Sequence, residues 1–197
     1  MSRSRSRSRP RRGSNASEET LVDDLNYVFS HDSPLNTCIR APQGPNLYYV
    51  WSDLARPTMT KIQRYDTGEP VAIIHWSSLG LHKVALGNGE PHKVSKTLEN
   101  GPIYSDVVTF KDGSGKKYDW KGSQTSNRLT LYARDSPNIP LAQFHRSRRW
   151  EAEGRTHRTK AYLRIQAKGQ AILDTIIWSF CFLEKARREG SRVERRL

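Results

Sequence analysis

The longest apolar stretch of the chain lies near its C-terminus, where only three of the thirteen residues 171–183 are polar. A helix over residues 172–188 would present apolar side chains on nearly every side, and such a helix has to be surrounded by lipid or by protein. Only nine residues separate Asp174 from Glu184, whereas a helix that spans a bilayer needs about 20. We therefore expect protein to surround this helix, and we expect no transmembrane segment.

The chain before this helix follows the shorter period of β-strands. Turn-forming residues recur about every 8 to 12 positions, which is typical of an all-β domain. Residues 134–140 are expected to form a turn. The pattern predicts a mainly β fold that closes around one hydrophobic C-terminal α-helix. The expected strands are residues 25–29, 37–40, 47–51, 59–65, 71–76, 83–86, 107–111, 116–121, 129–132, 141–145 and 161–165.

Positive charge is concentrated in a few segments. The chain has 33 Lys and Arg against 20 Asp and Glu, a formal net charge of +13. An excess of this size favours anionic partners such as nucleic acid, acidic lipid or acidic protein. A role in solubility alone is the competing interpretation. The charge gathers in residues 1–12, 145–168 and 187–196.

The first 20 residues form a low-complexity Arg-Ser tail with almost no apolar side chains. Such a segment cannot offset its chain entropy by burial, so we expect disorder over residues 1–20 and in the basic C-terminus 191–197. The folded domain is expected over residues 21–190. The tail could contact nucleic-acid phosphates, or phosphorylation could reverse its charge, or it could have no function. The candidate phosphorylation sites are Ser2, Ser4, Ser6 and Ser8.

Two cysteines, Cys38 and Cys181, are too few for a disulfide framework, which favours a reducing compartment. The N-terminal arginines precede no apolar stretch, so we expect no signal peptide. A cytoplasmic location is predicted, with a membrane-peripheral or nuclear location as the alternatives, for a chain expected to be a monomer.

A basic segment between the last two expected strands is the candidate binding site. Its arginines could pair with phosphate groups while an exposed tryptophan enters a membrane interface. The same tryptophan could instead stack on an unpaired base, or the segment could be a solvated loop. The candidate anion-binding residues are Arg146, Arg148, Arg149, Trp150, Arg155, Arg158 and Lys160.

Catalytic and metal-binding patterns are not evident. The six histidines lack metal-ligand spacing with cysteines or carboxylates. The run at residues 113–117 lacks the first glycine and the hydroxyl residue of a phosphate-binding loop, and it fits a hairpin turn. Asp174 is expected to cap the start of the helix. We predict no catalytic residue, no metal and no cofactor.

The order of these motifs resembles an uncharacterised fungal domain family that is abundant in mushroom-forming basidiomycetes. That family is similar to the tubby-like superfamily, which includes LURP-one-related and phospholipid-scramblase domains. The resemblance implies a closed antiparallel β-barrel threaded by the C-terminal helix, and it implies binding of phosphoinositide membranes. The segments that carry it are Tyr118-Asp119-Trp120-Lys121, Leu129-Thr130-Leu131-Tyr132, Leu141-Ala142-Gln143-Phe144, Ile172-Leu173-Asp174-Thr175-Ile176-Ile177 and residues 27–37.

The expected function is therefore that of a non-enzymatic module whose basic surface tethers it to anionic phospholipid head groups, phosphoinositides first. Association with RNA through the Arg-Ser tail and the basic segment is the alternative. An enzyme acting on lipids or small substrates and a protein-interaction scaffold remain open.

Overall fold

The computed structural model describes residues 24–53, 55, 58–101, 106–122 and 128–189. The expectations for the Arg-Ser tail and for the C-terminus 191–197 lie outside these residues, as do Ser2, Ser4, Ser6 and Ser8.

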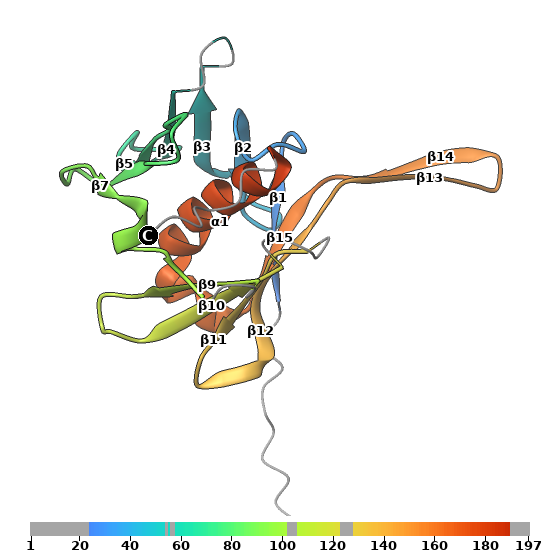
Figure 1. Cartoon of the computed structure of the whole chain (residues 1–197). Coiled ribbons are helices and arrows are strands. Elements are labelled where there is room, and N and C mark those ends of the chain that lie inside the picture. The colour runs from blue at the N-terminus through green and yellow to red at the C-terminus, as the bar shows by residue number, and fades with distance from the viewer. Residues whose placement is uncertain (1–23, 54, 56–57, 102–105, 123–127, 190–197) are drawn as a thin grey trace, which may run out of the picture.

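Thirteen strands of the described residues form one antiparallel sheet, and two more form a separate ribbon (Figure 1). Ten of the eleven strands expected from the sequence are present within one residue of their predicted limits. The strands of the sheet are β1 (Leu25–Phe29), β2 (Thr37–Arg40), β3 (Asn46–Ser52), β4 (Met59–Arg64), β5 (Pro70–His75), β6 (Lys83–Leu86), β7 (His92–Lys93), β8 (Glu99–Asn100), β9 (Val107–Lys111), β10 (Lys117–Lys121), β11 (Thr130–Ala133), β12 (Ser136–His145) and β15 (Tyr162–Ile165).

The strand order is β7-β6-β5-β4-β3-β2-β1-β15-β12-β11-β10-β9-β8. The late strand β15 joins the two halves of the sheet because it pairs with β1 on one side and with β12 on the other. The short 3-10 helix η1 (Val94–Lys96) connects the two end strands, β7 and β8. No ladder among the described residues pairs these end strands, so closure into a barrel stays a prediction, whereas the mainly β architecture is confirmed.

The strand β12 differs from the sequence prediction. Residues 134–140 were expected to turn, yet only Arg134 and Asp135 separate β11 from β12. Pro140 lies opposite Tyr132, where the register of the two strands shifts. A proline is tolerated at such an irregularity because no regular ladder hydrogen bond is required from it. The turn-like composition of this segment therefore marks a bulged strand.

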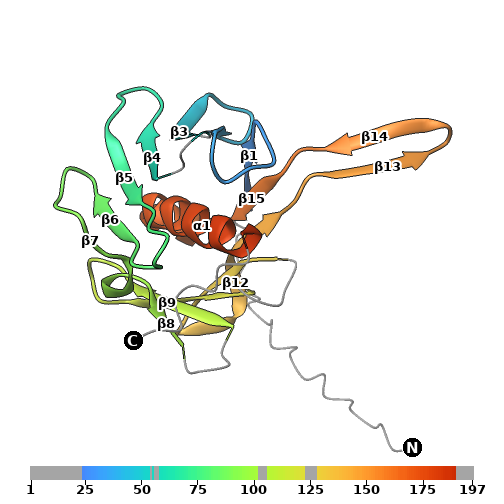
Figure 2. The ribbon, with the colours of Figure 1, turned by 45° about the horizontal axis from the view of Figure 1, so that its top comes forward.

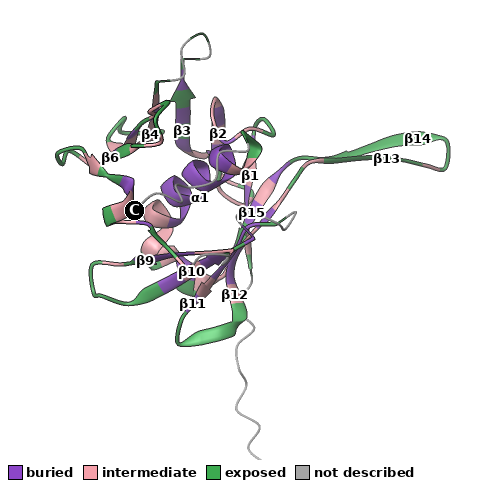
Figure 3. Cartoon of the chain, in the orientation of Figure 1, coloured by how far each residue is buried: buried purple, intermediate pink, exposed green. Residues whose placement is uncertain are grey.

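The helix α1 (Leu173–Arg188) follows the 3-10 helix η2 (Ala167–Ile172) and lies inside the curve of the sheet (Figure 2). All residues from Ile176 to Ala186 are buried, so every side of the helix contacts protein (Figure 3). Phe180 is fully buried, with its ring 4.6 Å from the ring of Phe144 and 5.5 Å from that of Phe29. The expectation that protein surrounds this helix is confirmed. No helix within the described ranges is long and apolar enough to cross a bilayer.

The antiparallel register places each connection at one of two ends of the sheet. The connections β1–β2, β3–β4 and β5–β6 share one end with the chain that leaves β12 at His145. We call this the arm end, after the ribbon described below. The turns β2–β3, β4–β5, β6–β7, β9–β10 and β11–β12 share the opposite, far end. The C-terminus of α1 lies at the arm end, because Arg188 contacts Asp32 in the β1–β2 connection.

Candidate functional site

The basic segment predicted as a binding site is a two-stranded ribbon that projects away from the rest of the molecule (Figures 1 and 2). It consists of β13 (Arg148–Ala152) and β14 (Arg155–Thr159), paired from Arg148 opposite Thr159 to Ala152 opposite Arg155. We call residues 148–159 the arm. At its tip Glu153 and Gly154 have φ of +51° and +68°, and two positive φ values suit a tight hairpin because they match the twist of the strands.

The register divides the side chains of the arm between two faces, because residues directly opposite one another share a face and successive residues alternate. Arg148, Trp150, His157 and Arg155 fall on one side, which we call the aromatic face. The ring of Trp150 stacks on that of His157, with centroids 5.4 Å apart and planes 16° from parallel. An arginine thus lies at each end of an aromatic pair, and this face carries no carboxylate of either strand.

The opposite face of the arm has a different chemistry. Arg149 lies opposite Arg158, and Glu151 lies opposite Thr156. The hydroxyl of Thr156 donates a hydrogen bond of 2.6 Å to the Glu151 carboxylate. The two faces therefore carry the same number of arginines, but only this second face places a carboxylate beside them.

Burial cannot account for the composition of the arm. Nine of its ten strand residues are exposed, and Trp150 itself is 45% exposed. A two-stranded ribbon without a packed face is at best marginally stable in water. The side chains of the arm are therefore available for contacts outside the folded domain.

The root of the arm is tied to the sheet and the helix through Asp32. The backbone N–H and the hydroxyl of Ser147 donate to one carboxylate oxygen, at 3.1 Å and 2.6 Å, and the Arg188 guanidinium donates to the other at 2.6 Å. Burial alone would raise the pKa of Asp32, but the hydrogen bonds from Ser147 and Arg188 outweigh it and lower the pKa below its ordinary value. The ionised Asp32 carboxylate therefore links the root of the arm to the end of α1.

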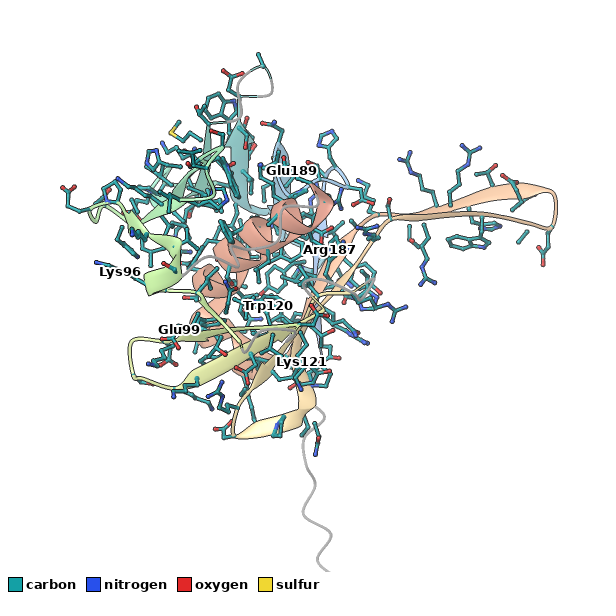
Figure 4. All side chains as sticks on the ribbon, in the orientation of Figure 1. Lys96, Glu99, Trp120, Lys121, Arg187 and Glu189 are labelled. Atoms are coloured by element: carbon teal, nitrogen blue, oxygen red, sulfur yellow. The ribbon has the colours of Figure 1, made fainter. Side chains whose placement is uncertain are left out.

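A second carboxylate, Glu184, lies in the same region and is completely buried. Both of its oxygens accept hydrogen bonds from Arg187, and one also accepts a 2.7 Å bond from Arg188. Arg146 forms an ion pair of 3.6 Å with the same carboxylate. Figure 4 labels Arg187 and Glu189 at this end of α1.

The structure brings most of the predicted site residues together but sorts them into three groups. Arg148, Trp150 and Arg155 share the aromatic face. Arg149 and Arg158 lie on the opposite face, and Lys160 follows the arm as an exposed residue. Arg146 stands apart at the root, where it forms an ion pair with the Glu184 carboxylate that Arg187 and Arg188 also contact.

Of the charged and aromatic residues on the aromatic face, His157 is the one that sequence analysis did not select. Its position depends on the pairing that sets it opposite Trp150. The pair Glu153-Gly154 was the available signal, because a glycine at a hairpin tip supports positive φ.

Asp174 lies in the first turn of α1, where its charge suits the helix dipole as expected, but it makes no capping hydrogen bond. Instead Asp174 accepts a bond of 2.6 Å from the Tyr48 hydroxyl and one of 2.7 Å from Arg64. Burial and the hydrogen bond to Asp174 raise the pKa of Tyr48. This cluster joins the helix to β3 and β4 and is structural. Within the described ranges, His, Cys, Asp and Glu form no group of three that could hold a metal ion.

Comparison with known proteins gives a family without an assigned function. The sequence matches the model of a family of unknown function (DUF6593) over residues 32–189. No curated protein matches the sequence. An X-ray structure of a protein from Arabidopsis thaliana is similar with a TM-score of 0.47 and 13% sequence identity, covering 84% of this chain and 92% of that chain. This likeness is too weak to support an argument about fold or function, so the resemblance to the tubby-like superfamily stays a prediction.

Proposed function

The chain belongs to this family of unknown function, DUF6593, and we propose that it is a non-enzymatic module that binds anionic phospholipid membranes through the aromatic face of its arm. The observation that carries the proposal is the composition of that face, in which Arg148 and Arg155 flank the stacked Trp150 and His157. Membranes that contain phosphoinositides are the first expected target, as the sequence resemblance implies.

The chemistry of the aromatic face suits lipid head groups. A guanidinium presents a planar fork of N–H donors that pairs with two phosphate oxygens at once. An indole combines an apolar body with a polar N–H and is favoured where an apolar phase meets water. Arg148 and Arg155 lie four residue steps apart along the ribbon, a span of about 13 Å. The arm would therefore lie along the membrane on this face, because its tip offers only Glu153 and Gly154.

Nucleic acid is the alternative partner, and the distribution of charge makes it less suitable. A two-stranded ribbon fits the major groove of DNA, but a groove surrounds the ribbon with phosphates on both sides. Glu151 on the second face would then lie near phosphate oxygens. A bilayer is planar and meets one face only, so the carboxylate stays in water.

Vesicle co-sedimentation of the full chain tests the proposal, with an RNA competitor present in parallel samples. Vesicles of phosphatidylcholine alone are compared with vesicles that also contain phosphatidylserine or a phosphoinositide at matched total charge. The key variant is Arg148→Ala with Arg155→Ala, and the matched control is Arg149→Ala with Arg158→Ala. Both pairs remove two positive charges from the arm, but from opposite faces.

We expect the first pair to weaken binding to anionic vesicles by about tenfold to thirtyfold, since each arginine near an anionic surface contributes about 1 kcal/mol. The control pair should lose less than about threefold, because its side chains point away from the membrane. Equal losses in both pairs would contradict a specific face. Displacement of the wild-type chain from vesicles by RNA would support the nucleic-acid alternative.

A further inference from the structure

The connection between β5 and β6, residues 76–82, exposes two large apolar side chains at the arm end of the sheet. Leu79 is 85% exposed and Leu81 is 53% exposed. The connection reads Trp-Ser-Ser-Leu-Gly-Leu-His and contains no Asp, Glu, Lys or Arg. We call residues 76–82 the leucine loop.

Both flanks of the leucine loop are packed against the central helix. The ring of Trp76 lies parallel to that of Phe182, with centroids 5.2 Å apart and planes 5° from parallel, and its indole N–H donates to Thr60 at 2.8 Å. The ring of His82 lies edge-on to both of these rings, at 5.2 Å and 5.7 Å. The loop therefore begins and ends at anchored side chains.

Hydrogen bonds within the loop hold its tip in a closed turn. The backbone N–H of Ser77 donates to Nδ1 of His82 at 3.1 Å, and the N–H of Gly80 donates to the Ser77 carbonyl at 3.1 Å. The N–H of Leu79 donates to the Ser77 hydroxyl at 3.2 Å. Gly80 adopts a φ of +79°, which is accessible to glycine without strain. The exposure of Leu79 and Leu81 is thus a property of an organised turn.

The leucine loop and the arm leave the sheet at the same end. His75 at the end of β5 pairs with Met59 at the start of β4. Because neighbouring strands are antiparallel, these residues lie at the same end of the sheet as the start of β15 and the end of β12. β15 and β5 are five strand spacings apart in the sheet order, or about 24 Å along the curved surface. The leucine loop and the root of the arm therefore border the same end of the sheet.

The charges beside the leucine loop favour approach of an anionic surface to the loop. Four of the five far-end turns carry a carboxylate, and only the β2–β3 turn, residues 41–45, carries none. The leucine loop carries none, and Lys83 and Lys93 pair across β6 and β7 directly beside it. The acidic residues of those four far-end turns are Asp66, Glu69, Glu90, Asp112 and Asp135.

We propose that the leucine loop is a second membrane contact, which inserts Leu79 and Leu81 into the boundary between head groups and acyl chains of the bilayer that the arm binds. The inference rests on the proposed function, because it assigns the apolar part of the same membrane contact. The arm supplies electrostatic attraction, which salt screens. The leucines supply burial of apolar area, which salt does not screen.

The first test compares two variants of the full chain. The loop variant combines Leu79→Ser and Leu81→Ser, and the control variant carries Ile139→Ser alone. Ile139 is 56% exposed and lies near the start of β12, toward the far end, so it controls for loss of an exposed apolar side chain. Binding to phosphatidylserine vesicles should fall by about tenfold in the loop variant, as expected for two partly buried leucines. Binding should also become more sensitive to salt. Ile139→Ser should bind as the wild type does.

The second test places an environment-sensitive fluorophore at Leu79→Cys in a Cys38→Ser background. The remaining thiol, Cys181, is only 1% exposed and is inaccessible to the label. Vesicles should shift the emission of this probe to shorter wavelength, whereas a probe at Ile139→Cys should not respond.

The outcomes separate the two proposals. If the arm variant Arg148→Ala with Arg155→Ala loses binding while the loop variant binds normally and the probe at position 79 does not shift, the proposed function stands and the leucine loop is not inserted. A shift of the probe at position 139 would also overturn the inference. If the wild-type chain binds none of the vesicles, both proposals are wrong.

Discussion

The helix α1 and the arm are the two extremes of this molecule, although only about a dozen residues separate them in the chain. In α1 a continuous run of eleven residues is buried, whereas nine of the ten strand residues of the arm are exposed (Figure 3). Charged residues occur in both, but their surroundings differ. Glu184 in α1 is neutralised by arginines, while the arginines of the aromatic face have no carboxylate on their own side of the ribbon. This contrast separates residues that hold the fold from residues available to a partner.

The two regions meet at the root of the arm. Asp32 accepts hydrogen bonds from Ser147, at the base of the arm, and from Arg188, at the end of α1. The helix therefore supports the arm mechanically, while the arm contributes no apolar contact to the core around the helix. Changes to α1 should affect stability, and changes to the arm should affect binding.

The largest expected effect is that of Phe180→Ala in the centre of α1. Phe180 is fully buried against Phe29 and Phe144, and deleting such a ring lowers the free energy of unfolding by about 3 to 5 kcal/mol. Trp150→Ala on the arm is the matched aromatic control, and it should change the free energy of unfolding by less than about 0.5 kcal/mol. Urea denaturation followed by circular dichroism measures both. A comparable loss in the control would mean that the arm is part of the cooperative core.

A smaller loss is expected for Glu184→Gln, which leaves Arg187 and Arg188 beside a neutral, buried group. Removing one partner of a buried ion pair costs about 3 kcal/mol. The control is Glu151→Gln, since the Glu151 side chain is exposed on the arm and contributes little to stability. Urea denaturation measures the free energy of unfolding of both variants. If the two variants are equally stable, the buried cluster at the end of α1 is not required for the fold.

The smallest of the three effects is expected for Asp32→Asn, and it depends on pH. The pKa of Asp32 is lowered in the folded protein, so its ionised form contributes stability that is present above its unfolded pKa near 4 and lost as pH falls through the folded pKa. Asp32→Asn should lower the free energy of unfolding by about 1.5 kcal/mol at pH 7. The difference from the wild type should shrink as pH falls through the folded pKa of Asp32.

Thermal denaturation across this pH range measures the Asp32 contribution. Asp53→Asn serves as the control because Asp53 is another acidic residue at the arm end, and its side chain accepts a hydrogen bond from the nearby backbone N–H of Ala55. A difference for Asp32→Asn that does not change with pH would contradict a role for the charge of Asp32.

The local pattern of apolar residues was sufficient to predict the helix and most strands of the sheet, because burial imposes a period on the apolar residues of each element. Strand β3 alternates buried and exposed positions, as its sequence suggests. The arm has no such period, since neither of its faces packs on a core. The charge pattern of the sequence placed its candidate residues in one segment, but their division into two faces required the register of β13 and β14.

The sequence by itself determined the mainly β fold, the helix inside it and the location of the basic segment, because each depends on neighbours within one element. Tertiary structure alone decided that Arg146 pairs with Glu184, that His157 stacks on Trp150, and that the leucine loop shares an end of the sheet with the arm. These relations join residues that are distant in the chain or depend on a turn. They follow from the register and curvature of the whole sheet, which no short stretch of sequence specifies.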